Sequence, residues 1–334
     1  MTPPSDSLAA RQPHSHNVST ATTRAPVKIG SIVGGLAGNL IEWYDFLAYS
    51  IFSIYFAKAF FLGFLQVSVV AGQLVALGLM LVMQRWLLTA EQIEHWGWRI
   101  PFVLGGVLAL FALYMRRNVT ESEAFVDSAK KRETSIAREV LAHWPQILLA
   151  IGITIGGTVA FYTFTVYMQK FLVNSVGLSK ESSTFVFTLA LLLYMPLQPL
   201  FGLLSDVIGR RKVLMIFGVS TTLFSVPLFT ALAHTKDPLV AFALSFAGLV
   251  MLSGFTSVHM LAKTELFPPR IRALAVGFPY ALTTAILGGT TEFVALRFKA
   301  SGHESYFYWY VTICAAISLV VYLKMPETRG RKFD

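Results

Sequence analysis

Residues 202–212 read G-L-L-S-D-V-I-G-R-R-K and form a short charged turn between two long apolar runs. The runs cover residues 183–204 and 213–232, and each is long enough to cross a bilayer as a helix. Gly209 permits a tight reversal, while Asp206 can accept hydrogen bonds from the free backbone donors of the next helix or pair with Arg210. Three consecutive cations predict that the turn lies on the cytoplasmic side. The turn could have a specific function, or it could be an ordinary positive-inside loop that only sets the orientation of the neighbouring helices.

The composition predicts a polytopic membrane protein. Of 334 residues, 55% are hydrophobic and 13% are charged, whereas roughly a quarter of the residues of soluble domains are charged. The formal charge of +9 does not indicate a nucleic-acid partner, because the basic residues lie in loops and tails, where orientation in the membrane accounts for them. The single cysteine, Cys314, excludes a disulfide framework within one chain.

We expect an all-α polytopic bundle with about nine membrane spans. They are predicted at about residues 30–56, 63–83, 101–115, 146–169, 183–204, 213–232, 238–261, 273–296 and 305–323. The predicted organisation is a disordered cytoplasmic tail at 1–29, an incomplete N-terminal transmembrane half at 30–115, a cytoplasmic connector at 116–145, a six-span C-terminal half at 146–323 and a cytoplasmic tail at 324–334.

The odd span count conflicts with the placement of the basic segments. With a cytoplasmic C-terminus, the basic loops at 116–145, 205–212 and 263–272 lie inside, but the basic N-terminal tail lies outside. We therefore expect three spans, on the order of 100 residues, to be missing between about Phe61 and Gly63, through a gene-model error or an ancestral deletion. Association of two copies is kept open as a way to complete the shorter half.

Two acids lie inside the first predicted span. Glu42 and Asp45 share a helical face with Gly35, Gly38 and Tyr49. Carboxylates inside a span are costly and should face a bundle or cavity, and two packed together resist ionising at once. This pattern indicates a site for proton coupling, and a structural polar anchor near the membrane boundary is the alternative.

Further polar positions occur in the predicted spans of the C-terminal half. The glycines at 152, 156, 277 and 288 are explained at least as well by close helix packing as by a cavity. Lys170, His259 and Glu292 are ionisable and need partners inside a bundle. We assign Lys263 to a cytoplasmic loop and Arg297 to the end of a span.

Several stretches resemble the metabolite:proton symporters of the major facilitator superfamily. Residues 38–46 (G-N-L-I-E-W-Y-D-F) resemble the first-span signature of that family, and residues 96–102 (W-G-W-R-I-P-F) resemble its fifth-to-sixth span loop. The pattern G-x-x-S-D-x-x-G-R-R-K resembles the loop signature of the superfamily. Residues 161–174, 265–274 and 307–312 resemble the 2-oxo-dicarboxylate carriers within the family. The family's second to fourth spans have no counterpart here.

The resemblance implies a secondary active transporter, embedded in the lipid bilayer of a bacterial inner membrane, that carries protons with a dicarboxylate such as alpha-ketoglutarate. The expected mechanism is rocking of two halves about a central site. We expect no cofactor, no metal and no enzyme activity, since the chain lacks a phosphate-binding loop, a metal-spaced His/Glu pair and a nucleophile elbow. The alternatives are a truncated, non-transporting relic and a symporter of citrate, shikimate or betaine.

The candidate residues fall into three groups. For proton coupling they are Glu42 and Asp45. For substrate binding they are Tyr162, Tyr167, Gln169, Lys170, Gln198, His259 and Glu292. For a conformational latch at the charged turns they are Asp206, Gly209, Arg210, Arg211, Glu265, Arg270 and Arg272.

Overall fold

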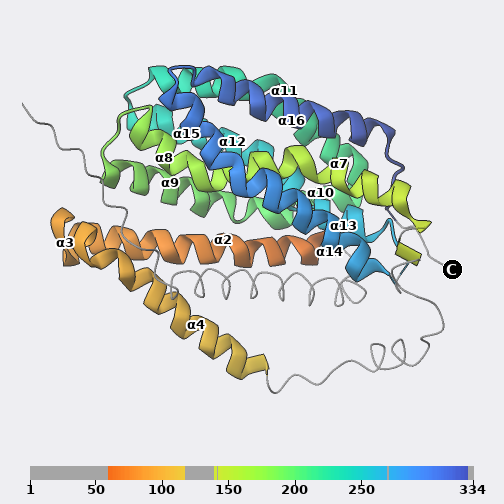
Figure 1. Ribbon diagram of the computed structural model, residues 1–334, viewed down its shortest axis with the longest axis horizontal. Helices are drawn as coiled ribbons and strands as arrows, with labels where there is room; N and C mark the ends of the chain where they lie inside the picture. Colours follow the sequence, from red (N-terminus) through yellow and green to blue (C-terminus); the bar gives the residue numbers. More distant parts are fainter. Residues whose placement is uncertain (1–58, 117–138, 141, 269–270, 330–334) are drawn as a thin grey trace, which may run out of the picture. The chain divides into compact units, whose positions relative to one another are not determined.

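The structure, a computed structural model, describes residues 59–116, 139–140, 142–268 and 271–329 (Figure 1). Within these ranges the chain forms helices joined by turns and short loops, with no β-strand, which confirms the predicted all-α class. The α-helices are α2 (Ala59–Val82), α3 (Ala90–His95), α4 (Ile100–Arg116), α7 (Trp144–Phe161), α8 (Met168–Asn174), α9 (Lys180–Tyr194), α10 (Leu197–Ile208), α11 (Arg210–His234), α12 (Pro238–Thr256), α13 (His259–Thr264), α14 (Arg272–Thr283), α15 (Gly289–Ala300) and α16 (Ser305–Lys324).

Seven helical segments in this part of the chain are long and apolar enough to cross a membrane. They are Gln66–Leu87, Trp144–Asn174, Lys180–Ile208, Arg210–His234, Pro238–Thr264, Arg272–Ala300 and Ser305–Lys324. The last six coincide with the six spans predicted after residue 146. The span predicted at 101–115 is helix α4, which is apolar but shorter than these seven. The span predicted at 30–56 and most of the connector at 116–145 lie outside the described residues.

Helix α7 lies at the centre of the C-terminal spans. It packs against α12, α14 and α16, and α12 packs in turn against α9 and α11 (Figure 1). Small residues allow the closest of these approaches. A Cβ on Gly156 would lie 2.5 Å from the carbonyl oxygen of Cys314 on α16, and one on Gly152 would lie 2.6 Å from a methyl carbon of Val321. These two glycines therefore serve helix packing.

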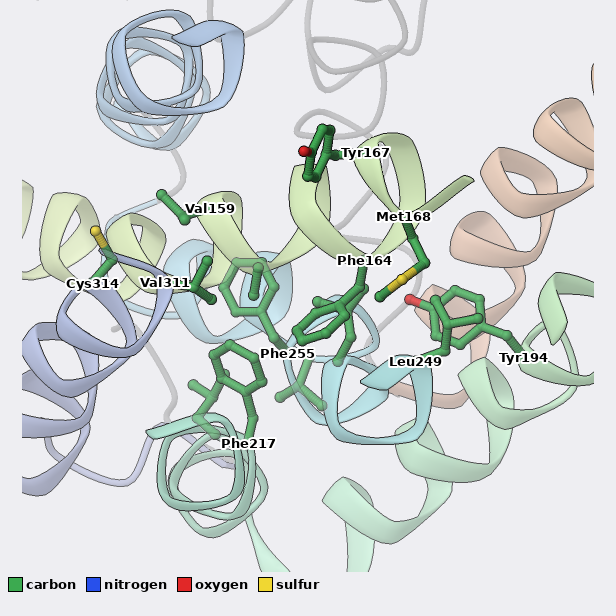
Figure 2. Packing of buried hydrophobic residues seen from close by; sticks show 14 of the residues in the cluster. Val159, Phe164, Tyr167, Met168, Tyr194, Phe217, Leu249, Phe255, Val311 and Cys314 are labelled. Atoms are coloured by element: carbon green, nitrogen blue, oxygen red, sulfur yellow. The ribbon is translucent and has the colours of Figure 1, made fainter. Parts of the chain in front are cut away.

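Aromatic rings fill the space between the central helices. Phe164 stacks on Phe229 with ring centroids 5.6 Å apart, and Phe217 lies 5.3 Å from Phe255. Figure 2 shows Phe164, Phe217 and Phe255 gathering between helices that are distant in sequence. Rings of this size bury large apolar areas, so they join the π-helical turn at Tyr162–Tyr167, α11 and α12 into one core.

Four of the six C-terminal spans are interrupted, and the interruptions place polar groups inside the bundle. Spans 144–174 and 272–300 contain π-helical turns at Tyr162–Tyr167 and Thr284–Gly288. Span 180–208 breaks at Met195–Pro196, because proline lacks the backbone N–H that would continue the helix. Span 238–264 breaks between α12 and α13 without a proline. Instead, the Gln198 side-chain oxygen accepts hydrogen bonds from Thr256 Oγ1 (2.8 Å) and Ser257 Oγ (3.1 Å) at that break.

Candidate functional site

The charged turn at 202–212 is built around a buried arginine. The side chain of Arg210 is 4% exposed, and its Nη1 donates to Asp206 Oδ1 (2.7 Å) and to the Ser205 carbonyl (3.0 Å). Its Nη2 lies 3.7 Å from Glu265 Oε1, which comes from the turn after α13. The predicted pairing of Asp206 with Arg210 is therefore present, and it extends to a second carboxylate.

The C-terminal segment supplies the cap of helix α11. Glu327 accepts hydrogen bonds from the backbone nitrogens of Arg210 (Oε1, 2.9 Å) and Arg211 (Oε2, 3.2 Å), which are free donors at the start of that helix. Gly209 has a φ of +101°, and a Cβ at this position would collide with the Glu327 carboxylate. Glycine is therefore required here for two reasons, the backbone conformation and the space that the cap occupies.

Two further arginines tie the C-terminal segment to the turn. Arg211 donates from Nε to the Tyr322 carbonyl (3.1 Å) and from Nη2 to the Leu323 carbonyl (2.5 Å), at the end of α16. Arg329 donates from Nη1 to the Val207 carbonyl (2.6 Å) near the end of α10. Cations at helix C-termini satisfy free carbonyls and interact favourably with the helix dipole. Arg211, Lys212, Glu327 and Arg329 also line a hollow of about 420 Å³.

The candidate latch residues that the structure describes converge only in part. Asp206, Gly209, Arg210, Arg211 and Glu265 form one network with Glu327, and Glu265 Oε2 accepts from Thr328 Oγ1 (2.6 Å). Arg272 donates from Nε to the Phe267 carbonyl (3.2 Å) in the same loop region. Arg270 lies outside the described residues. The capping role of Glu327 was missed, and the only signal for it was an acid just after the last span.

Burial sets the protonation of Glu265, which lies just beyond the end of span 238–264. Burial raises the pKa of its carboxyl above the ordinary value of 4.5, even though the hydrogen bond from Thr328 and the charge of Arg210 act to lower it. The pKa of Glu265 is therefore higher in the folded protein than in the unfolded chain. Its contribution to the free energy of unfolding is fully present below the pKa of the unfolded chain and is lost as pH rises through the pKa of the folded protein.

We therefore expect Glu265→Gln to be more stable relative to wild type at neutral pH than at pH 4. Thermal unfolding temperatures measured between pH 4 and 8 test this. A difference between variant and wild type that does not change with pH would contradict it.

Lys170 and Glu292, two of the predicted substrate-binding residues, pair with each other. Lys170 Nζ on α8 donates to Glu292 Oε1 on α15 at 2.5 Å. The Lys170 side chain is 53% exposed and that of Glu292 is 34% exposed, so the described helices do not enclose the pair. The structure therefore brings these two residues together, and the charge of Lys170 is balanced within the C-terminal half.

The two predicted tyrosines lie in different surroundings. The ring of Tyr162 is half-buried against Gly288, where a Cβ would lie 2.5 Å from its Cε2 atom. Tyr167 is 1% exposed, with its ring centroid 5.4 Å from that of Phe307 and 6.2 Å from that of Phe171. In Figure 2 it projects from the opposite side of its helix to Phe164. Tyr167 thus has the packing of a core residue.

Both predicted glutamines cross-link helices. Gln169 donates from Nε2 to Thr184 Oγ1 (2.8 Å), which joins α8 to α9. Gln198 is fully buried and holds the break between α12 and α13, and the Tyr194 hydroxyl lies 2.9 Å from Thr256 Oγ1 in the same group. Neither side chain is free to meet a ligand in this arrangement.

The assignment of Lys263 to a loop is wrong. Lys263 lies in α13 and is 0% exposed, while its neighbour on the same helix, His259, is 6% exposed. The break in span 238–264 turns this short helix inward, and hydropathy along the chain does not reveal such a break. Arg297 lies in the last turn of α15 and is exposed, in agreement with its assignment to a span end.

The proton-coupling candidates, Glu42 and Asp45, lie outside the described residues. Their assignment stays a prediction from the sequence.

Comparison with known proteins places the chain among transporters. Residues 149–333 match the Major Facilitator Superfamily, and residues 57–146 match the family described as Sugar (and other) transporter. The alpha-ketoglutarate permease of Escherichia coli is 40% identical over 274 residues, which are 82% of this chain and 63% of the permease. The chain therefore spans less than two thirds of the length of this relative.

Other relatives are more distant. The inner membrane metabolite transport protein YhjE of Escherichia coli is 29% identical over 280 residues (81% of this chain, 63% of that protein). The proline/betaine transporter of Salmonella typhimurium is 27% identical over 257 residues (72% of this chain, 50% of that protein).

The fold has a counterpart among solved structures. The crystal structure of a D-xylose-proton symporter superposes with a TM-score of 0.64 at 18% identity, covering 81% of this chain and 64% of the symporter. These relatives are transporters and not enzymes. Seven apolar helices of membrane-spanning length, this fold and a superfamily match over more than half of the sequence lead to one conclusion: the chain is a membrane protein that belongs to the Major Facilitator Superfamily.

Proposed function

We propose that the chain is a secondary active transporter that carries a dicarboxylate such as alpha-ketoglutarate, together with protons, across a bacterial inner membrane. The observation that carries this proposal is the 40% identity to the alpha-ketoglutarate permease over 82% of the chain. A dianion cannot cross hydrocarbon unaided, so its path needs fixed cations or oriented hydrogen-bond donors. Lys170, Lys263 and the hydroxyl groups around them are such groups in the described part of the chain.

The proposed organisation is an N-terminal part at 30–115 and a six-span half at 146–323, joined by a connector at 116–145. The two matched family ranges, 57–146 and 149–333, meet close to the end of this connector, which supports that division. We place the basic turn at 202–212 and the C-terminal segment in the cytoplasm, because basic loops favour that side. We assign proton coupling to Glu42 and Asp45. The chain is shorter than its relative, and we assign the difference to three spans that would lie between about Phe61 and Gly63.

Uptake of labelled alpha-ketoglutarate tests the proposal. The chain is expressed in cells that lack their own dicarboxylate carriers, and its amount in the membrane is measured at the same time. We expect uptake above that of empty cells, and we expect a protonophore to abolish it because the proton gradient drives the cargo. Protein present in the membrane without uptake would favour the non-transporting relic.

Osmolyte transport is the second candidate, since proline/betaine transporters are also among the relatives. A zwitterion and a dianion make different demands on fixed charge, so competition distinguishes the two. Unlabelled succinate should compete with alpha-ketoglutarate, whereas glycine betaine should not. Uptake of labelled betaine that resists excess dicarboxylate would instead support the osmolyte.

A further inference from the structure

Lys263 has a fully buried side-chain amine without a carboxylate partner in the described part of the chain. Its Nζ lies 3.3 Å from Thr154 Oγ1 on α7 and 4.4 Å from the ring centroid of Tyr280 on α14. The side chain is 0% exposed. Three spans, which contain α7, α13 and α14, therefore converge on one amine.

The described groups around Lys263 do not offset the free energy needed to bury a charged ammonium there. Moving an ammonium out of water costs several kcal/mol even after relaxation, and a paired carboxylate is the usual compensation. One long hydrogen bond to a hydroxyl and one aromatic face supply only part of that energy. A charge placed this way inside a span is expensive for the fold, and such residues are commonly functional.

His259 adds a second unsatisfied group next to Lys263. The two residues are four positions apart on α13, so their side chains lie on one face, about 6 Å apart at their Cβ atoms. The His259 ring stacks on Phe255 at 4.1 Å and lies 6.0 Å from the Tyr280 ring. Its Nδ1 atom is buried without a hydrogen-bond partner among the described residues. Lys263 and His259 therefore offer two nitrogen groups, one turn apart on α13, to a single carboxylate.

The other lysine of the predicted substrate set differs in this respect. Lys170 has a carboxylate partner, Glu292, at 2.5 Å, and both side chains are partly exposed. An anion that bound Lys170 would have to displace that carboxylate. An anion that bound protonated Lys263 would compensate a charge that has no carboxylate partner among the described residues, so the gain in free energy is larger.

We propose that Lys263, together with His259 and Thr154, forms the anion-binding site that takes a carboxylate of the transported acid. This inference rests on the proposed function, because it names the residues that would recognise a dicarboxylate. The structure shows Lys263 enclosed, so an anion reaches it when α13 moves relative to α7 and α14. The break before α13 is the place in span 238–264 where such a movement costs least backbone hydrogen bonding.

Ligand-dependent stability of the purified full chain in detergent tests the site directly. The probes are alpha-ketoglutarate, succinate and glycine betaine, and the variants are Lys263→Met, Lys263→Arg and Lys236→Met. The last is a matched control, because Lys236 is exposed in the loop between α11 and α12. We expect both dicarboxylates, but not betaine, to raise the unfolding temperature of the wild type and of the control.

Lys263→Met should weaken apparent dicarboxylate binding at least ~30-fold, because truncating one partner of a buried charge pair has an effect of this order. Without ligand, the same variant should be as stable as wild type or more stable, since it removes a buried amine that has no carboxylate partner in the described ranges. Lys263→Arg should retain part of the binding. A merely structural lysine would give the opposite result without ligand, namely a lower unfolding temperature.

Three outcomes would overturn the site. The first is a dicarboxylate affinity of Lys263→Met within ~3-fold of wild type. The second is that neither dicarboxylate raises the unfolding temperature of wild type. The third is that Lys263→Met unfolds at a lower temperature than wild type without ligand but binds dicarboxylate normally. Uptake measured in parallel separates the two proposals. Normal uptake with an unchanged KM in Lys263→Met leaves the transport function standing and removes the site, whereas wild-type binding without uptake removes the transport function and leaves the site.

Discussion

Replacing Arg210 by methionine should lower the free energy of unfolding by about 3–5 kcal/mol, because it leaves two carboxylates without their shared cation. The Arg210 side chain is 4% exposed, and those of Asp206 and Glu265 are 24% and 17% exposed. Removing one partner of a buried ion pair takes away an attraction that offset the desolvation of the two carboxylates. Reversible unfolding in mixed micelles measures the change.

Two further variants make the reason for this loss testable. Lys212→Met removes a cation two residues away, but Lys212 is exposed, so we expect its effect to stay within about 0.5 kcal/mol. Combining Arg210→Met with Asp206→Asn removes one of the two carboxylates that Arg210 had neutralised and should recover part of the stability. A double variant that is no more stable than Arg210→Met alone would rule out the lost attraction between Asp206 and Arg210 as a cause.

Gly156→Leu should destabilise the chain by about 3 kcal/mol through overpacking between α7 and α16. A Cβ at this position would lie 2.5 Å from the Cys314 carbonyl oxygen and 2.7 Å from Ala315 Cα. These are backbone atoms, which cannot rotate away as a flexible side chain can. The two helices would have to separate, and the Ser318 hydroxyl would lose its hydrogen bonds with the Gly156 nitrogen (2.8 Å) and the Gly152 carbonyl (2.7 Å).

Gly72→Leu on α2 is the matched control. A Cβ on Gly72 would meet nothing within 4 Å, and leucine has a higher helix propensity than glycine. We therefore expect this variant to be as stable as wild type or slightly more stable. Equal losses at the two glycines would show that helix separation is not what destabilises Gly156→Leu.

Much of the fold could be predicted because hydropathy and charge are local properties of the chain. The apolar runs between residues 146 and 323 became six membrane-spanning segments with nearly the predicted bounds. The order Asp, Gly and Arg in residues 206–210 predicted both the reversal at Gly209 and the ion pair that closes it. The interaction between Asp206 and Arg210 spans only four residues, so it needs no knowledge of the rest of the fold.

The cap of α11 is different, because its partners are more than 100 residues apart. The sequence suggested that Asp206 could accept the free donors at the start of this helix. In the structure Glu327 accepts from the backbone of Arg210 and Arg211, since α16 packs along α11 and delivers the C-terminal segment to that end. Nothing in residues 202–212 alone could identify this acceptor.

The substrate-binding predictions depended even more on tertiary structure. The choice rested on polar residues in apolar runs, which says that a side chain needs a partner but not which partner it has. In the structure Gln169 and Gln198 form hydrogen bonds with neighbouring helices, and Lys170 pairs with Glu292. Lys263 was set aside because it follows an apolar run, yet the break before α13 carries it into the interior.

By itself, the sequence determined the membrane-spanning class, the positions of the spans and the tight charged reversal, because each depends on residues that are neighbours along the chain. Only the tertiary structure decided which charges are neutralised and which are not. Lys170 and Lys263 both follow or lie within apolar runs, but one meets a carboxylate 122 residues away and the other meets a hydroxyl and an aromatic ring. That difference arises from the packing of whole helices, which brings together residues that no local pattern relates.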